Sequence, residues 1–167
     1  MLPIDFHIQR REALLDKMLP NSVCVIPGAQ LQTRSRDTEY AFRQDSDFWY
    51  LTGFHEPDAW LILSNSADYD GEYALLACLP KDEHAEIWHG RRIGVDAVPD
   101  LYGIDDACEV DQVDWALHDI VNGHDNLYFA SGHFAPADEL IFSVLDKLLT
   151  GPKQTKKAAS TNNEVGW

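Results

Sequence analysis

Short apolar runs closed by turn residues constrain the fold of this chain more than any other feature. The runs at 22–26 (SVCVI), 59–64 (AWLILS) and 72–79 (EYALLACL) have the length and composition of buried strands. The turn-rich sequence NSADYDG separates the second run from the third, so these two are expected to pair as an antiparallel hairpin. Further strands are expected at 107–110 and 126–130, which gives enough strands for one β-sheet.

Segments with helical periodicity lie between and around these runs. They are expected at 5–18, 45–52, 95–102, 111–121 and 136–149. Asp5 and Asp111 are the expected N-caps of the first and fourth helices, and Gly53 is expected to end the second. The buried face of the first helix is expected to contain Ile8, Leu14, Leu15 and Met18. The order of elements favours an α/β fold, with a mixed β-sheet flanked by helices.

The length of the chain fits one domain followed by a short tail. Its 167 residues, 45% of them hydrophobic, are enough to bury a core of ordinary size. Residues 1–150 are expected to form this domain. Residues 151–167 (GPKQTKKAASTNNEVGW) are polar and basic, which is typical of a linker, so a further domain is expected to follow.

The charge of the chain narrows the choice of partners. Lysine and arginine number 13 against 28 acidic residues, a net charge of −15. Such a surface repels phosphate backbones and anionic lipids, so neither nucleic acid nor membrane is an expected partner. The three cysteines form no CxxC motif, and Cys24 and Cys78 lie in apolar runs, where they are expected to be buried and reduced. No signal peptide or bilayer-spanning run is recognisable, and a cytoplasmic location is expected.

The standard catalytic motifs are missing from the sequence. It contains no HExxH, no GxSxG, no P-loop and no Rossmann fingerprint. The grouping closest to a metal site is His84, Glu86 and His89, whose side chains suit zinc or manganese. Their spacing does not place all three on one face of a helix, so solvated loop residues are the favoured interpretation. Neither a metal site nor a catalytic residue is therefore expected in this chain.

Two polar segments, 29–44 and 80–94, are expected to form long loops. Loops of this length in a compact domain are usually functional. Both segments contain arginines and aromatic residues, the types that dominate contact energies. Core packing is the favoured role of the aromatic residues after the first segment, Phe48, Trp49 and Tyr50. A contact role is favoured for Trp88, because Ile87 is its only apolar neighbour.

Residues 40–57, YAFRQDSDFWYLTGFHEP, resemble the signature YxFRQxSxFxYLTGFxEP of aminopeptidase P N-terminal domains. The upstream TRS with the spaced Asp37, the sequence EIWHGRR at 86–92 and the sequence QRREAL at 9–14 resemble the same family. The resemblance covers about residues 7–150. It is strongest to the bacterial Xaa-Pro aminopeptidases.

The resemblance implies a parent enzyme with two domains. The N-terminal domain is a mixed sheet with flanking helices and is not catalytic. The C-terminal "pita-bread" domain, which would follow this chain, holds two manganese ions on Asp, Asp, His, Glu and Glu. Such an enzyme releases the N-terminal residue from peptides that have proline in second position, using a metal-bridging hydroxide.

The resemblance also implies a role for this domain, which is to support a homo-oligomer and to shape the active site. Trp88 is expected to reach the catalytic pocket of a neighbouring subunit, with Asp37 and Arg91 also near the pocket. His89 departs from the family, which commonly has Phe there, and this affects the expected packing of the loop. The implied partners are the C-terminal catalytic domain, neighbouring subunits and proline-containing peptides.

Two other functions stay open. The chain can be the matching domain of a prolidase-type sibling with the same two-domain plan, although the EIWHGRR sequence favours the aminopeptidase. It can also be a non-enzymatic module that binds peptides or proteins. The absence of the metal ligands from this sequence fits such a binding module, but it fits an isolated N-terminal domain of the enzyme equally well.

Overall fold

A five-stranded sheet in the order β6-β5-β4-β1-β7 forms the centre of the computed structural model. The structure describes residues 3–30, 33–34, 38–39, 43–81, 92–129 and 135–150. The strands are β1 (Ser22–Pro27), β4 (Trp60–Ser64), β5 (Tyr73–Cys78), β6 (Asp106–Glu109) and β7 (Asn126–Tyr128). Two further strands, β2 (Thr33–Arg34) and β3 (Thr38–Glu39), form a small antiparallel pair within the segment expected to be a loop.

Strand directions place the ends of β1 and β5 at one edge of the sheet. β4 pairs antiparallel with both β1 and β5, which confirms the predicted hairpin. β7 is parallel to β1, and β6 is parallel to β5. Because β1 and β5 therefore run in the same direction, their carboxyl ends share an edge with the start of β4. We call this edge the carboxyl edge.

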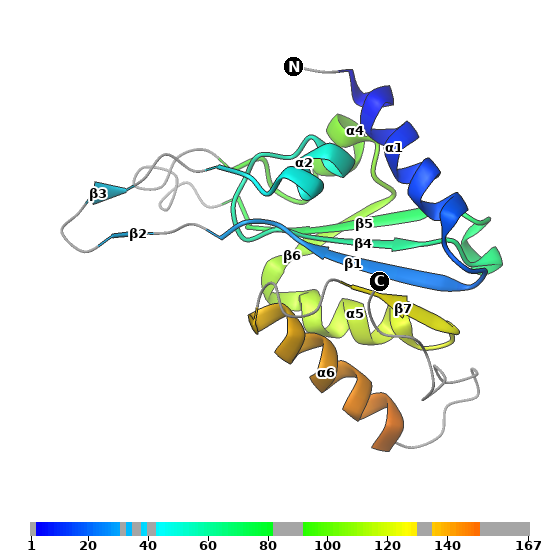
Figure 1. Cartoon of the computed structure of the whole chain (residues 1–167). Coiled ribbons are helices and arrows are strands. Elements are labelled where there is room, and N and C mark those ends of the chain that lie inside the picture. Colours follow the sequence, from blue (N-terminus) through cyan, green and yellow to red (C-terminus); the bar gives the residue numbers. More distant parts are fainter. Residues whose placement is uncertain are drawn as a thin grey trace.

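Helices cover both faces of the sheet (Figure 1). One face carries α1 (Ile4–Lys17), α2 (Ser46–Thr52) and α4 (Val98–Tyr102), and the other carries α5 (Val113–Val121) and α6 (Ala135–Thr150). The short 3-10 helices are η1 (Ala67–Tyr69) and η2 (Val110–Gln112). The predicted mixed sheet with flanking helices is confirmed.

Alternate side chains of the strands divide the core into two clusters. In β1, Val23 and Val25 pack toward α5 and α6, whereas Cys24 and Ile26 pack toward α1 and α2. A strand buried on both faces needs apolar residues at every position, which explains the uninterrupted runs in the sequence. A side chain as fully buried as Leu61 stabilises the fold by about 1.5–3 kcal/mol.

The two N-caps predicted from the sequence are wrong. α1 begins at Ile4 after Pro3, without a side-chain cap, and Asp5 lies inside its first turn. Asp111 lies within η2, and α5 begins at Val113, also without a side-chain cap. An aspartate inside the first turn still favours the helix through the dipole, but it does not set where the helix starts.

The buried face of α1 is more polar than expected. His7, Arg11 and Leu15 are buried, whereas Ile8 and Leu14 are only half-buried, and Met18 is buried beyond the end of the helix. The Arg11 guanidinium donates to the carbonyls of Leu51 at 2.7 Å and Gly103 at 2.8 Å. These carbonyls belong to the ends of α2 and α4, so one charged side chain joins three helices.

The boundaries of α2 follow local chemistry. Asp45 is the N-cap and accepts from the Phe48 N–H at 3.0 Å. Gly53 ends the helix with a φ of 71°, as predicted, and a Cβ there would lie 2.7 Å from His7 Nε2. Phe48 is fully buried as expected, but Tyr50 is 46% exposed, so the core role predicted for Tyr50 is wrong.

Candidate functional site

The predicted pocket residues Asp37, Trp88 and Arg91 lie outside the described residues, as do His84, Glu86 and His89. The described residues around them show where their segments begin and end. Segment 31–42 follows β1, and segment 82–91 follows β5. Both segments therefore leave from the carboxyl edge, beyond which the β2–β3 pair extends (Figure 1).

Gln44 closes the base of segment 31–42. Its Oε1 accepts from the N–H groups of Ala29 at 2.8 Å and Asp45 at 3.0 Å. Its Nε2 donates to the carbonyls of Phe54 at 3.1 Å and Glu56 at 2.9 Å. These four bonds satisfy the whole hydrogen-bonding capacity of the side-chain amide. The amide, only 6% exposed, thus ties the two ends of the segment to the turn after α2.

Glu56 anchors the end of segment 82–91. Its Oε2 accepts from the Ile93 N–H at 2.8 Å, and the side chain is buried. Lys81 Nζ donates to the Arg92 carbonyl at 3.3 Å, which brings the two flanks of the segment together. Gly94, with a φ of 82°, packs so closely on Lys81 that a Cβ would lie 2.9 Å from Lys81 Cβ. We call Gln44 and Glu56 together the polar hub.

The three thiols are held in the neutral form. Burial, followed by the carboxylate of Glu56, raises the pKa of Cys78 to about 12. Burial also raises the pKa of Cys24 to about 12, and burial with Asp111 and Glu109 raises that of Cys108 to about 11. A cysteine nucleophile needs a lowered pKa, so none of the three thiols is suited to nucleophilic catalysis.

The structure brings together a serine–histidine pair that the sequence did not reveal. Ser64 Oγ and His124 Nε2 are 2.6 Å apart, although 60 positions separate them in the chain. Both residues are buried, and Ser64 Oγ also accepts from the Ser66 N–H at 3.1 Å. A fully buried hydroxyl that holds a turn is a structural group, since a substrate has no access to it.

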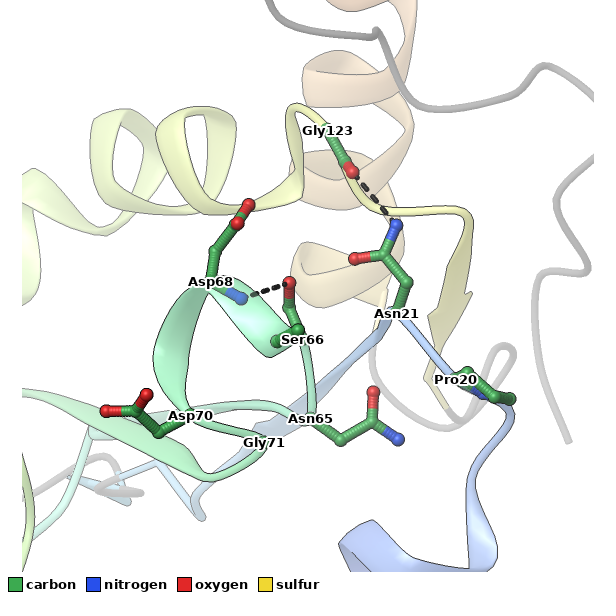
Figure 2. Close-up of a pocket in the computed structure, with 9 residues that line it drawn as sticks. Pro20, Asn21, Asn65, Ser66, Asp68, Asp70, Gly71 and Gly123 are labelled. Carbon is green, nitrogen blue, oxygen red and sulfur yellow. Dashed lines mark hydrogen bonds between the residues drawn. The ribbon is translucent and has the colours of Figure 1, made fainter.

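A depression at the opposite edge of the sheet offers little for chemistry. It has a volume of about 660 Å³ and is lined by Pro20, Asn21, Asn65, Ser66, Ala67, Asp68, Asp70, Gly71 and Gly123. Asn21 donates to the Gly123 carbonyl at 3.0 Å, and Ser66 accepts from the Asp68 N–H at 3.2 Å. Both hydrogen bonds are drawn in Figure 2. The side chains of Asn21, Asn65 and Ser66 bind main-chain groups of these turns, and the depression lies at the ends of the strands away from both segments.

The described part of the chain has no group of three or more histidine, cysteine, aspartate or glutamate side chains placed to hold a metal ion. These residues therefore do not fit a dimanganese centre. Because His84, Glu86 and His89 are outside them, the expected absence of metal from the chain stays a prediction. Among the helices that the structure describes, none has the length and apolar character needed to cross a bilayer.

Comparison with known proteins identifies relatives over most of the chain. Residues 7–128 match the family described as aminopeptidase P, N-terminal domain. The Xaa-Pro aminopeptidase of Escherichia coli (strain K12) is 43% identical over 153 residues, which cover 92% of this chain and 34% of that protein. The Xaa-Pro aminopeptidase of Haemophilus influenzae is 35% identical over 127 residues, or 76% of this chain and 29% of that protein. This chain spans about a third of the length of these curated relatives.

Solved structures agree with this match. The zinc-substituted aminopeptidase P of E. coli in complex with product aligns with a TM-score of 0.89 and 39% identity. The alignment covers 99% of this chain and 36% of that chain. The low-pH form of the E. coli enzyme aligns with the same TM-score and 38% identity.

Proposed function

This chain belongs to the family of aminopeptidase P N-terminal domains, and from this premise we propose that it is the non-catalytic accessory domain of a Xaa-Pro aminopeptidase. The domain supports a homo-oligomer and supplies Trp88, Asp37 and Arg91 to the substrate pocket. Residues 1–150 form the domain, and residues 151–167 link it to a catalytic domain.

One observation carries the proposal. The two segments that hold all three proposed pocket residues leave from one edge of the sheet, and hydrogen bonds of Gln44 and of Lys81 join the described flanks of each. Side chains from different segments can form one pocket wall only if the segments start close together. A Trp offers such a wall a large rigid face for a proline ring or an apolar first side chain.

The reaction belongs to the proposed catalytic domain. The parent enzyme releases the N-terminal residue from peptides with proline in second position, and the two manganese ions would be bound outside the described residues. A pocket that accepts short peptides needs walls, and walls supplied by a neighbouring subunit require an oligomer. Cys24, Cys78 and Cys108 are free thiols, which supports a reducing cytoplasmic compartment.

The role of Trp88 can be tested in a chimera in which this chain replaces the matching third of the E. coli enzyme. Trp88→Ala should lower kcat/KM on a tripeptide with central proline by at least roughly 10-fold, because even one missing methylene in an apolar pocket has an effect of that size. Bound metal should be unchanged. In the 167-residue chain the same substitution should cost less than about 1 kcal/mol of unfolding free energy, because the proposal assigns this side chain to the pocket and not to the core.

Trp115→Ala is the matched control, because Trp115 is 71% exposed on α5 and lies on neither segment. This control should leave kcat/KM unchanged. The proposal for Trp88 fails if Trp88→Ala destabilises the chain by about 3–5 kcal/mol, as loss of a core Trp would, while the kinetics stay normal.

Substrate preference separates the alternative functions. A prolidase-type sibling would cleave Xaa-Pro dipeptides and reject longer peptides, whereas an aminopeptidase accepts the longer ones. A non-enzymatic module would bind proline-containing peptides as the isolated chain and gain no activity in the chimera. Steady-state kinetics of the full-length parent protein on a dipeptide and a tripeptide, with peptide titration of this chain alone, distinguishes all three.

A further inference from the structure

We propose that Glu56 and Gln44 are positioning residues: the polar hub fixes the described residues that flank segments 31–42 and 82–91, and acts through these flanks on the pocket residues proposed for the two segments. The hydrogen bonds of the polar hub involve only described residues. The link from the polar hub to a substrate pocket rests on the function proposed above.

Glu56 is a single residue that binds the flanks of both segments, 31–42 and 82–91. Its main-chain carbonyl accepts from Gln44 Nε2 at 2.9 Å, and Gln44 in turn binds Ala29 and Asp45 on either side of segment 31–42. Its side-chain Oε2 accepts from the Ile93 N–H at 2.8 Å, just after segment 82–91. A shift of one base is therefore transmitted to the other through a single peptide unit and side chain.

The buried carboxylate of Glu56 favours a role in placing the loop bases, in addition to any role in stabilising the fold. A buried carboxylate carries a large desolvation penalty, which a neutral acceptor for the same N–H would avoid. A carboxylate that accepts from a main-chain N–H makes a shorter and stronger bond than a neutral group does. Glu56 is 8% exposed and makes this bond to a residue that directly follows segment 82–91.

Amide hydrogen exchange of the full 167-residue chain tests the coupling. Glu56→Ala should speed exchange of the Ile93 amide by roughly tenfold or more, the factor for loss of one hydrogen bond. Glu56→Gln keeps an acceptor oxygen and should restore most of the protection. Gln44→Ala should speed exchange at Ala29 and Asp45, and Leu117→Ala, in the cluster on the other face, is the control for general destabilisation.

Faster amide exchange only at the residues that lose a hydrogen bond supports the proposal, and equally faster exchange throughout the chain overturns it. If Glu56→Ala speeds exchange equally at Ile93 and along α5, as Leu117→Ala should, then Glu56 only stabilises the fold. Unchanged exchange at Ile93 overturns the proposal as well. If Glu56→Ala does not fold, the wild-type chain can be tested by NMR. A scalar coupling between the Ile93 amide nitrogen and the Glu56 side-chain carboxyl carbon is expected, and its absence would overturn the proposal.

A double-mutant cycle in the chimera tests the link to the pocket. Glu56→Ala should lower kcat/KM in the presence of Trp88 and have little further effect in the Trp88→Ala background, because its effect passes through the loop. Additive losses would overturn the link. If Trp88→Ala alone has no effect, the proposed function has failed, and the exchange results still decide whether the polar hub positions the segments.

Discussion

Arg11 joins three helices through hydrogen bonds to the carbonyls of Leu51 and Gly103. Burial lowers the pKa of its guanidinium, and the charges of Asp105, Glu72 and Glu12 act in the opposite direction. An arginine remains charged despite such a shift, and its planar group can serve several carbonyls at once. Those carbonyls lie at the ends of helices, where no main-chain donor is left to satisfy them.

Arg11→Ala should therefore lower the free energy of unfolding by about 3 kcal/mol, because the carbonyls of Leu51 and Gly103 lose their donor inside the core. The neighbouring Arg10→Ala is the matched control. Arg10 lies 4.5 Å from the centroid of the Phe6 ring, a cation–π contact worth about 0.5–1 kcal/mol. Urea unfolding measures both, and equal losses would contradict the assigned role of Arg11.

The cysteines give a second prediction for single residues. Cys24 and Cys78 should resist maleimide labelling in the native chain, because both are buried and their pKa values are raised to about 12. Cys108 is partly exposed, with its pKa raised to about 11, and should react first. Mass spectrometry of a labelling time course reads out each site, and the urea-unfolded chain provides the fully reactive control. Rapid native labelling of Cys24 would refute the assigned burial.

Helix ends separate what a sequence pattern can predict from what it cannot. Asp45 caps α2 through its bond to the Phe48 N–H, whereas Asp5 makes no cap bond in α1. Asp45→Ala should cost about 1 kcal/mol, and Asp45→Asn should restore most of it, since Asn is an equally good cap. Asp5→Ala should change the stability by less than about 0.5 kcal/mol. Thermal or urea unfolding that ranks Asp5→Ala as the more damaging change would contradict this difference.

The sequence predicted the elements better than the contacts between them. The hairpin and the end of α2 at Gly53 depend on residues close in the chain, and both are confirmed. The burial of Arg11 depends on carbonyls 40 and 92 positions away, and Glu56 binds an N–H 37 positions away. No local periodicity reports such partners. The candidate site was therefore recognisable only as two unusual segments, without the residues that hold them.

At the scale of the whole molecule, the buried thiols and phenols couple stability to alkaline pH. Cys24 has a folded-state pKa of about 12 against an ordinary value of 9.0, and Tyr73 is raised by burial and by Asp106. These groups are neutral when protonated, so the folded chain keeps protons that the unfolded chain has already lost. Stability should be unaffected below pH 9 and should fall above it, by about 1.4 kcal/mol per pH unit for the Cys24 thiol, whereas the loss from the half-buried Tyr73 phenol begins only above pH 10.

Urea unfolding at pH 8, 9.5 and 10.5 measures this slope. The comparison with Cys24→Ala is decisive, because that variant removes one titrating group and should flatten the slope while keeping the fold. A slope that is unchanged in Cys24→Ala would mean that the thiol does not contribute, and rising stability at alkaline pH would contradict the direction of the shifts.

The last prediction concerns the molecule as an isolated chain: it should hydrolyse no Xaa-Pro peptide and hold no manganese at a specific site. The described residues have no group of three or more ligating side chains that could hold a metal. With a net charge of −15 the surface will still attract Mn²⁺ weakly, so the measurement must separate a site from a charged surface. Calorimetric titration at low and at high salt does so, since diffuse attraction is screened by salt and a site formed by direct ligands is not. Turnover of a Gly-Pro peptide, or one saturable micromolar site that survives high salt, would overturn the prediction. In that case His84→Ala and His89→Ala would identify the ligands, because these are the histidines that the sequence groups with Glu86.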